Sequence, residues 1–277
     1  MPEMPTASIR HLIIVLGDQL DQGSTAFDGF DPAQDMVWMA EVAEESTHVW
    51  SAKQRIAIFL SAMRHFAAEL RERRLPLRYI RLDDDHNTGT LASELQRAIA
   101  DLRPQGLILT APGDWRVLQA LRGVAAQAGL PLDLRDDTHF FSTVREFAAH
   151  AQGRKQLRLE YWYRELRQKH GVLMDGRQPV GGQWNFDADN RESFGKGGPQ
   201  NVPAPFRVAP DAITREVIDL VSTRFADHPG SLESFAWPVT RADALRALDN
   251  FVQQRLPLFG QFEDAMWAGE VWLWHSQ

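Results

Sequence analysis

The sequence contains no cysteine, and this absence excludes several kinds of site. Without thiols the chain has no disulfide, no thiolate zinc site and no cysteine-held iron–sulfur cluster of its own. No apolar run approaches the roughly 18 residues that a membrane-spanning helix needs, so we expect no membrane span. Residues 1–10 lack the apolar core of a secretory signal, which makes a cytoplasmic location the default expectation.

Positive charge is also scarce. The chain has 30 Lys and Arg residues against 37 Asp and Glu residues, and its formal net charge is −7. A nucleic-acid role would therefore need a local basic patch. Hydrophobic residues make up 44% of the 277 positions, which is enough for one large or two smaller domains with real cores.

The first half of the sequence alternates strand and helix patterns. Short apolar runs typical of buried strands occupy residues 12–16, 36–40, 77–80, 106–110 and 132–134. Helical patterns occupy residues 51–74, 90–102 and 114–129. Such alternation predicts an α/β fold, in which residues 8–140 form a Rossmann- or flavodoxin-like domain with five parallel strands and helices on both faces.

The second half combines helical patterns with a long irregular stretch. Helical patterns at residues 144–151 and 156–169 precede a stretch, 171–210, that is rich in Gly, Pro, Asn and Asp and has no period. We therefore assign residues 141–210 to a helix plus an irregular interdomain linker. Helical patterns return at residues 214–225 and 240–256, the latter with Thr240 as N-cap, so residues 211–277 are expected to begin a truncated all-helical domain.

Ligands of an open parallel sheet bind beyond the carboxyl ends of its strands. The residues that follow the first, second and fourth predicted strands are Gly17, Asp18, Gln19, residues 41–47 and residues 112–115. Several carboxylates at one rim would repel a phosphate but accept hydrogen bonds from hydroxyl or ring N–H groups. No glycine-rich phosphate motif is present either. The pattern favours a neutral, hydroxyl-bearing heteroaromatic ligand, with Trp38, Phe59 and Trp115 as candidate aromatic walls.

A second interpretation of the same residues is purely structural. Asp18 and Asp114 would cap helices, and residues 41–45 would form a solvated loop. The residue types alone leave both interpretations open.

Five short motifs resemble the photolyase and cryptochrome superfamily. They are Leu16-Gly-Asp-Gln-Leu20, Ser61-Ala-Met-Arg-His-Phe66, Pro112-Gly-Asp-Trp-Arg116, Leu159-Glu-Tyr-Trp-Tyr-Arg164 and Pro179-Val-Gly-Gly-Gln-Trp-Asn-Phe-Asp187. The sequence looks most similar to the deoxyribodipyrimidine photolyase-related proteins of the bacterial iron–sulfur (6-4) type. The likeness covers their N-terminal part only and runs from about residue 10 to residue 276, in the family's order.

This resemblance implies a light-antenna site for 6,7-dimethyl-8-ribityllumazine, whose ribityl chain carries hydroxyls and no phosphate. The implied contacts are Gly17, Asp18, Ala40, Glu41, Val42, Ala43, Glu44, Glu45, Ser46, Thr47, His48 and Asp114. Asp114 stands where relatives often have the longer Glu. The antenna would pass excitation to a flavin in the following domain.

The resemblance also implies what this chain lacks. In relatives, FAD and a [4Fe-4S] cluster belong to a following helical domain, whose positions we expect to be absent here. The chain alone is therefore not expected to repair DNA, and a separately encoded FAD domain would be one partner. An unrelated flavodoxin-like binding protein and an inactive photolyase fragment stay open as alternatives.

Two further charged segments are candidates for a functional role. Arg154, Lys155, Arg158 and Arg164 lie beside aromatic residues and could contact DNA, although a surface helix that packs its aromatics inward has the same pattern. Residues 83–86, Asp-Asp-Asp-His, are predicted to form a solvated turn and not a metal site, because consecutive side chains diverge.

Overall fold

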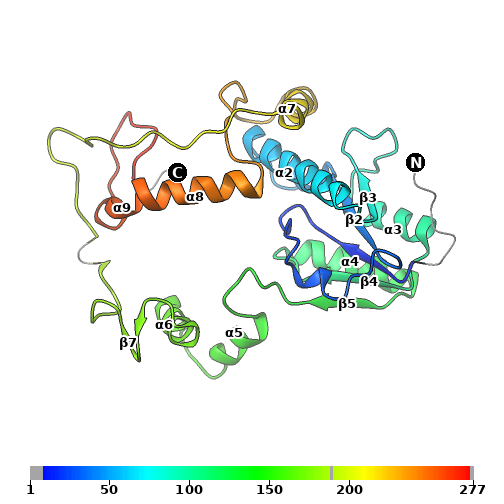
Figure 1. Cartoon of the computed structure of the whole chain (residues 1–277), viewed down its shortest axis with the longest axis horizontal. Helices are drawn as coiled ribbons and strands as arrows, with labels where there is room; N and C mark the ends of the chain where they lie inside the picture. The colour runs from blue at the N-terminus through cyan, green and yellow to red at the C-terminus, as the bar shows by residue number, and fades with distance from the viewer. Residues whose placement is uncertain (1–8, 188–189, 275–277) are drawn as a thin grey trace. The chain divides into compact units, whose positions relative to one another are not determined.

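The computed structural model describes residues 9–187 and 190–274, which group into two compact units (Figure 1). The first unit contains the chain up to Phe140 together with Pro210–Phe235, and the second contains Phe141–Ala209 and the chain from Ala236 on. No helix in the described ranges has both the length and the apolar character that crossing a membrane requires.

A five-stranded sheet forms the centre of the first unit. Its strands are β1 (His11–Ile14), β2 (Met36–Ala40), β3 (Leu77–Ile80), β4 (Gly106–Thr110) and β5 (Leu132–Arg135). They lie in the order β3-β2-β1-β4-β5, and every neighbouring pair is parallel. The predicted α/β fold with a five-stranded parallel sheet is confirmed.

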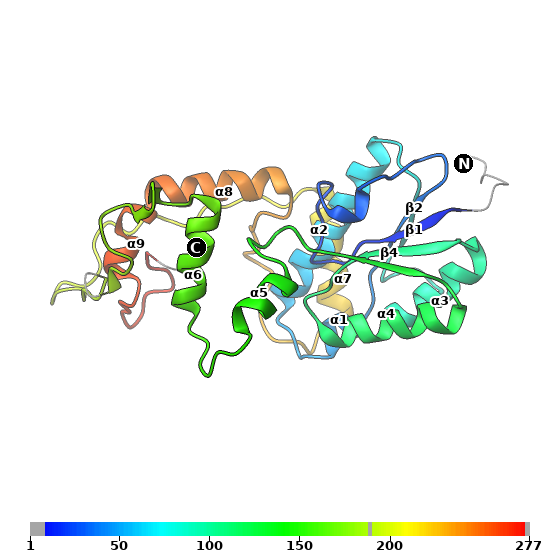
Figure 2. The same ribbon diagram turned by 90° about the horizontal axis from the view of Figure 1, so that it is seen from below.

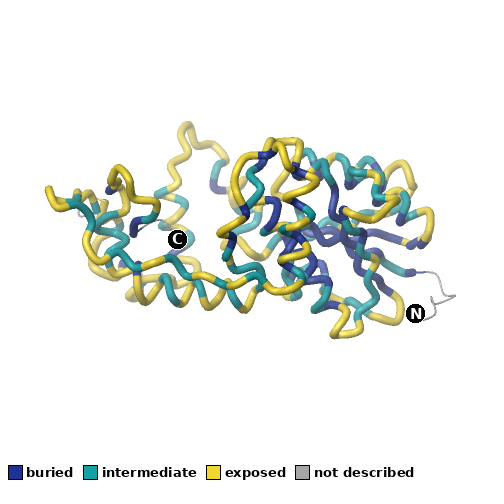
Figure 3. The backbone as a smooth tube through the Cα atoms, turned by 90° about the horizontal axis from the view of Figure 1, so that it is seen from above, coloured by how far each residue is buried: buried dark blue, intermediate teal, exposed yellow. Residues whose placement is uncertain are grey.

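Alternate residues of β1, β2 and β4 enter two different apolar clusters. In β1, Leu12 and Ile14 pack with α3 (Leu91–Leu102) and α4 (Trp115–Ala128), which lie side by side in Figure 2. Ile13 points to the other face, toward α2 (Lys53–Glu72) and the short 3-10 helix η1 (Thr25–Phe27). Buried residues concentrate in these strands (Figure 3), because both faces of the sheet are covered by helices.

The helix after the long linker returns to the first unit. α7 (Ala212–Arg224) packs on α2, and its Val217 and Val221 are completely buried. Asp211 caps α7 by accepting a hydrogen bond from the Thr214 amide at 2.8 Å. Further along the chain, the Pro229 carbonyl accepts a hydrogen bond from the Lys53 amide, the first of α2. α2 is therefore held between the sheet and the segment 210–235.

The second unit combines helices with long irregular segments. Its elements are α5 (Val144–Ala151), α6 (Leu159–His170), the two-residue strands β6 (Met174–Asp175) and β7 (Gln178–Pro179), α8 (Arg241–Gln254) and α9 (Leu256–Phe262). Thr240 caps α8 as predicted, accepting a hydrogen bond from the Asp243 amide. α6 begins later than the sequence pattern suggested because Arg158 has an extended backbone, with φ −108° and ψ 123°.

Truncating a buried valine of α7 tests this packing. Val221→Ala removes two buried methyl groups and should lower the free energy of unfolding by about 2 kcal/mol, measured by chemical denaturation. Val252→Ala, the same change at a half-exposed position of α8, is the control and should stay within about 0.5 kcal/mol. Equal effects of the two substitutions would contradict the packing of α7 on α2.

Candidate functional site

A cleft of about 200 Å³ opens at the carboxyl ends of β1, β2 and β4. Its lining residues are Leu16, Gly17, Asp18, Ala40, Glu41, Val42, Glu45, Ser46, Ser51, Arg55, Ile56, Phe59, Leu60, Met63, Leu91, Pro112, Asp114 and Val117. This is the edge at which α/β sheets bind ligands. This volume is smaller than the range of about 300–1,000 Å³ that is common for ligand pockets. Part of a bicyclic ligand with a side chain would therefore lie outside the cleft, at its opening.

The structure brings together eight of the twelve residues expected at the antenna site. Gly17, Asp18, Ala40, Glu41, Val42, Glu45, Ser46 and Asp114 all line the cleft. Ala43, Glu44, Thr47 and His48 are outside the lining. They belong to the single turn α1 (Glu44–Thr47) and its two flanking residues, and Thr47 and His48 are exposed. A helical turn can present only some of its side chains to one side.

One wall of the cleft comes from the first turns of α2. Ile56, Phe59, Leu60 and Met63 form an apolar surface there, and Arg55 lies beside them. A 20-residue helix is about 30 Å long, whereas a five-residue strand spans about 17 Å, so the start of α2 extends past the strand ends. Only Phe59 of these wall residues was expected from the sequence.

The other two predicted aromatic walls are wrong. Trp38 is completely buried and belongs to the cluster between the sheet and α3–α4. Trp115 is 70% exposed and is outside the cleft lining. Strand alternation places Trp38 on the opposite face of the sheet from α2.

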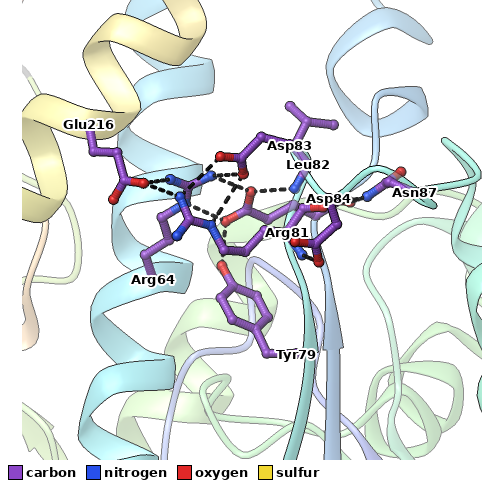
Figure 4. A network of polar contacts seen from close by, with 9 residues as sticks. Arg64, Tyr79, Arg81, Leu82, Asp83, Asp84, Asn87 and Glu216 are labelled. Carbon is purple, nitrogen blue, oxygen red and sulfur yellow. Dashed lines mark hydrogen bonds and ion pairs between the residues drawn. The ribbon is translucent and has the colours of Figure 1, made fainter.

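Beneath the cleft, Glu41 is the centre of a buried polar network, and its partners Arg64, Tyr79 and Leu82 are labelled in Figure 4. Its carboxylate accepts two hydrogen bonds from Arg64, at 2.8 and 3.0 Å, one from the Leu82 amide at 2.8 Å and one from the Tyr79 hydroxyl. Its carbonyl accepts a hydrogen bond from Asn87 at 2.7 Å. With four donors on its carboxylate, the Glu41 side chain has little capacity left for a ligand.

The same network extends to the helix that packs on α2. Arg64 also contacts Asp83 at 2.9 Å and Glu216 of α7 at 3.6 Å, and Arg81 pairs with both acids. Burial opposes the charge of Arg64, but the hydrogen bonds and charge of Glu41 outweigh it and raise the pKa of Arg64. The turn at residues 83–86 is therefore not merely solvated, because Asp83 is part of this network.

The acids at the rim are not free carboxylates either. Arg116 of α4 pairs with Glu44 at 3.4 Å, Glu45 at 2.7 Å and Asp114 at 3.3 Å. Asp114 also caps α4 by accepting a hydrogen bond from the Arg116 amide at 2.7 Å. Asp114 therefore caps a helix, as the structural interpretation expected, and also lines the cleft. The expectation that the rim carboxylates would repel a phosphate did not include Arg116, whose charge offsets Glu44, Glu45 and Asp114.

Asp18 is the exception among the acids of the cleft. In the described part of the chain its carboxylate has no ion pair. The surrounding protein removes water from the carboxyl, and the charges of Glu45, Asp137 and Asp114 add to this effect, so the pKa of Asp18 is raised. Among the described residues, no cluster of three or more metal-ligating side chains is present.

Of the four basic residues that could contact DNA, Arg154 and Arg164 make contacts within the second unit. Arg164 pairs with Glu160 and lies 5.4 Å from the Trp184 ring, and Arg154 pairs with Glu165 at 3.0 Å. Lys155 and Arg158 are exposed. A DNA contact by this segment stays a prediction.

Breaking the buried ion pair should be costly. Arg64→Met leaves Glu41 buried without its cation and should lower the free energy of unfolding by about 3–5 kcal/mol in chemical denaturation. Arg81→Met is the control, since Arg81 is about a third exposed and its pairs should contribute at most about 1 kcal/mol. If Arg64→Met cost no more than the control, Glu41 would not depend on this partner.

Removing the charge of Asp18 should stabilise the fold at neutral pH. Its folded pKa lies above its unfolded value, so this group lowers stability as pH rises through that interval, and the penalty is absent below the ordinary value of 3.8. Asp18→Asn should therefore raise the denaturation midpoint at pH 7 and have little effect at pH 3. Asp85→Asn, which removes an exposed carboxylate elsewhere, controls for net charge. Lower stability of Asp18→Asn at pH 7 would contradict the direction of this shift.

Comparison with known proteins agrees with the fold and the motifs. The family model described as deoxyribodipyrimidine photo-lyase-related protein matches residues 13–237. A (6-4) photolyase of Agrobacterium fabrum is 46% identical over 269 residues, which cover 97% of this chain and 52% of that protein. The chain thus spans about half the length of the curated relative that it matches. It belongs to the family of deoxyribodipyrimidine photo-lyase-related proteins.

Proposed function

We propose that the cleft binds an antenna pigment of the 6,7-dimethyl-8-ribityllumazine type. The observation that carries this proposal is the composition of the cleft, in which an apolar wall from α2 faces the polar strand ends. When bound, such a pigment supplies absorption of near-ultraviolet or blue light. The role of the protein is to hold the ring and its hydroxyl chain in a fixed place.

The side chains of the cleft fit both parts of this ligand. Phe59, Leu60 and Met63 offer an apolar surface to a planar ring. The Asp18 carboxylate is hydrogen-bonded only to its own backbone amide, and the Ser46 hydroxyl makes no side-chain hydrogen bond among the described residues. The carboxylate can therefore accept hydrogen bonds from ribityl hydroxyls, and the Ser46 hydroxyl can accept or donate them. The loop after β1 lacks the glycine-rich pattern that holds phosphates, which favours a pigment without phosphate.

We further propose that this chain is the antenna part of a photolyase-type protein. The similar protein from Agrobacterium fabrum is named a (6-4) photolyase and is about twice as long. The flavin and any repair of DNA would then depend on a further domain, either in the same protein or in a separate chain. A different polyol or nucleoside in the same cleft is the competing assignment.

Titration with the pigment tests this proposal. The purified chain should bind added 6,7-dimethyl-8-ribityllumazine, detected as a change in the fluorescence of the pigment. The double variant Asp18→Ala/Glu45→Ala should bind it at least about tenfold more weakly, because hydrogen bonds to charged groups contribute about 1.5–3 kcal/mol each.

A matched double variant controls for the loss of charge. Asp85→Ala/Glu72→Ala removes two exposed acids of the same unit that lie outside the cleft and should leave the affinity unchanged. If the wild-type chain takes up no lumazine, the proposed function is wrong. If the wild type binds but both double variants bind equally well, the pigment binds elsewhere.

A further inference from the structure

Two charged side chains of the cleft have no ion-pair partner within the described ranges, Asp18 and Arg55. The other charged groups of the lining are engaged: Glu41 with Arg64, and both Glu45 and Asp114 with Arg116. A ligand in the cleft would therefore meet one unshared carboxylate and one unshared guanidinium. Arg55 was not expected from the sequence.

Arg55 lies against the aromatic wall. Its Cζ atom is 5.7 Å from the centroid of the Phe59 ring, and Phe59 is 38% exposed. This distance is typical of a cation held over an aromatic face. The pair places a planar donor group close to an apolar ring at the cleft.

The strand end beside this pair leaves little room for a side chain at Gly17. A Cβ atom there would lie 3.0 Å from the Met63 sulfur and 3.7 Å from Cδ1 of Phe59. The backbone that leads to Asp18 therefore passes directly by the apolar wall. A ligand on Phe59 would lie close both to this backbone and to the Arg55 guanidinium.

The chemistry of the two charged groups restricts what can bind. A guanidinium has five N–H donors and no acceptor, whereas an ionised carboxylate only accepts. The matching ligand is a planar ring that has carbonyl or ring-nitrogen acceptors and also carries hydroxyl or N–H donors. A ring without carbonyls, such as adenine, would offer the Arg55 donors only ring nitrogens.

We propose that Arg55 determines the specificity of the cleft by donating hydrogen bonds to the carbonyl edge of a planar dione ring that packs on Phe59, while Asp18 accepts from the donors of the ligand. This inference deepens the proposed function by naming a residue that determines specificity. It rests on the proposed function for the identity of the ligand as a lumazine. It also makes a broader claim, that the cleft prefers dione rings to rings that lack carbonyls.

The test compares two arginines of the same helix. Arg55→Gln removes the charge inside the cleft. Arg71→Gln is the matched control, because the Arg71 Cζ also lies 5.7 Å from an aromatic centroid, that of Tyr79, but outside the cleft lining. The affinities of 6,7-dimethyl-8-ribityllumazine, riboflavin and adenosine are measured for the wild type and both variants. The first two carry the dione ring, and adenosine has a ribose but no ring carbonyl.

We expect Arg55→Gln to weaken lumazine and riboflavin binding by about tenfold or more and to change adenosine binding by less than about twofold. Arg55→Lys, which keeps the charge but loses the planar donor group, should give an intermediate affinity. The lumazine absorption band should shift between the wild type and Arg55→Gln, because a cation at the carbonyl edge changes the ring's electronic environment. Arg71→Gln should behave as the wild type.

The outcomes separate the two claims. If the wild type binds lumazine and Arg55→Gln equals Arg71→Gln in affinity and spectrum, the role of Arg55 is overturned and the proposed function stands. If the wild type binds riboflavin in an Arg55-dependent way but no lumazine, the pigment assignment falls and the role of Arg55 is supported. If adenosine binds best, or if no ligand of the three binds, the specificity claim is overturned.

Discussion

The buried pair between Glu41 and Arg64 is the interaction on which the site depends. Glu41 directly follows β2 and lines the cleft, while its carboxylate binds α2 through Arg64 and the segment after β3 through the Leu82 amide. A buried carboxylate without a cation would cost several kcal/mol, so these elements must stay together. The same arginine reaches Glu216 of α7, and the pair thereby joins the returning segment 210–235 to the floor of the cleft.

Local sequence signals were sufficient for the layout of the α/β unit. Apolar runs predicted the bounds of β2, β3 and β4 as they are observed, and Asp114 and Thr240 cap helices where the patterns begin. Strand and helix periods depend on neighbouring residues alone, which is why these features can be predicted. α7 begins at Ala212, before the predicted residue 214, because Asp211 is its N-cap.

The chemistry of the cleft was harder to predict because it depends on partners distant in sequence. The rim appeared acidic since Arg116 and Arg64 come from helices whose contacts no local pattern reveals. One signal was available: Arg64 lies on the apolar face of α2 with Leu60 and Ala67, and a charge on a buried face requires a partner. No such pattern indicated a role for Arg55. It comes before the first buried residue of α2, and its sequence context is that of an ordinary exposed arginine. The cleft is therefore one in which most charges are balanced internally and two are left for a ligand.

A crystal structure of the chain with 6,7-dimethyl-8-ribityllumazine would test the account most directly. The account predicts the ring on Phe59 with its carbonyl edge toward Arg55, the ribityl hydroxyls near Asp18, and the Glu41–Arg64 pair intact beneath. A pigment bound away from the ends of β1 and β2, or a ribityl chain that makes no contact with Asp18 while the ring turns its methyl groups to Arg55, would contradict it.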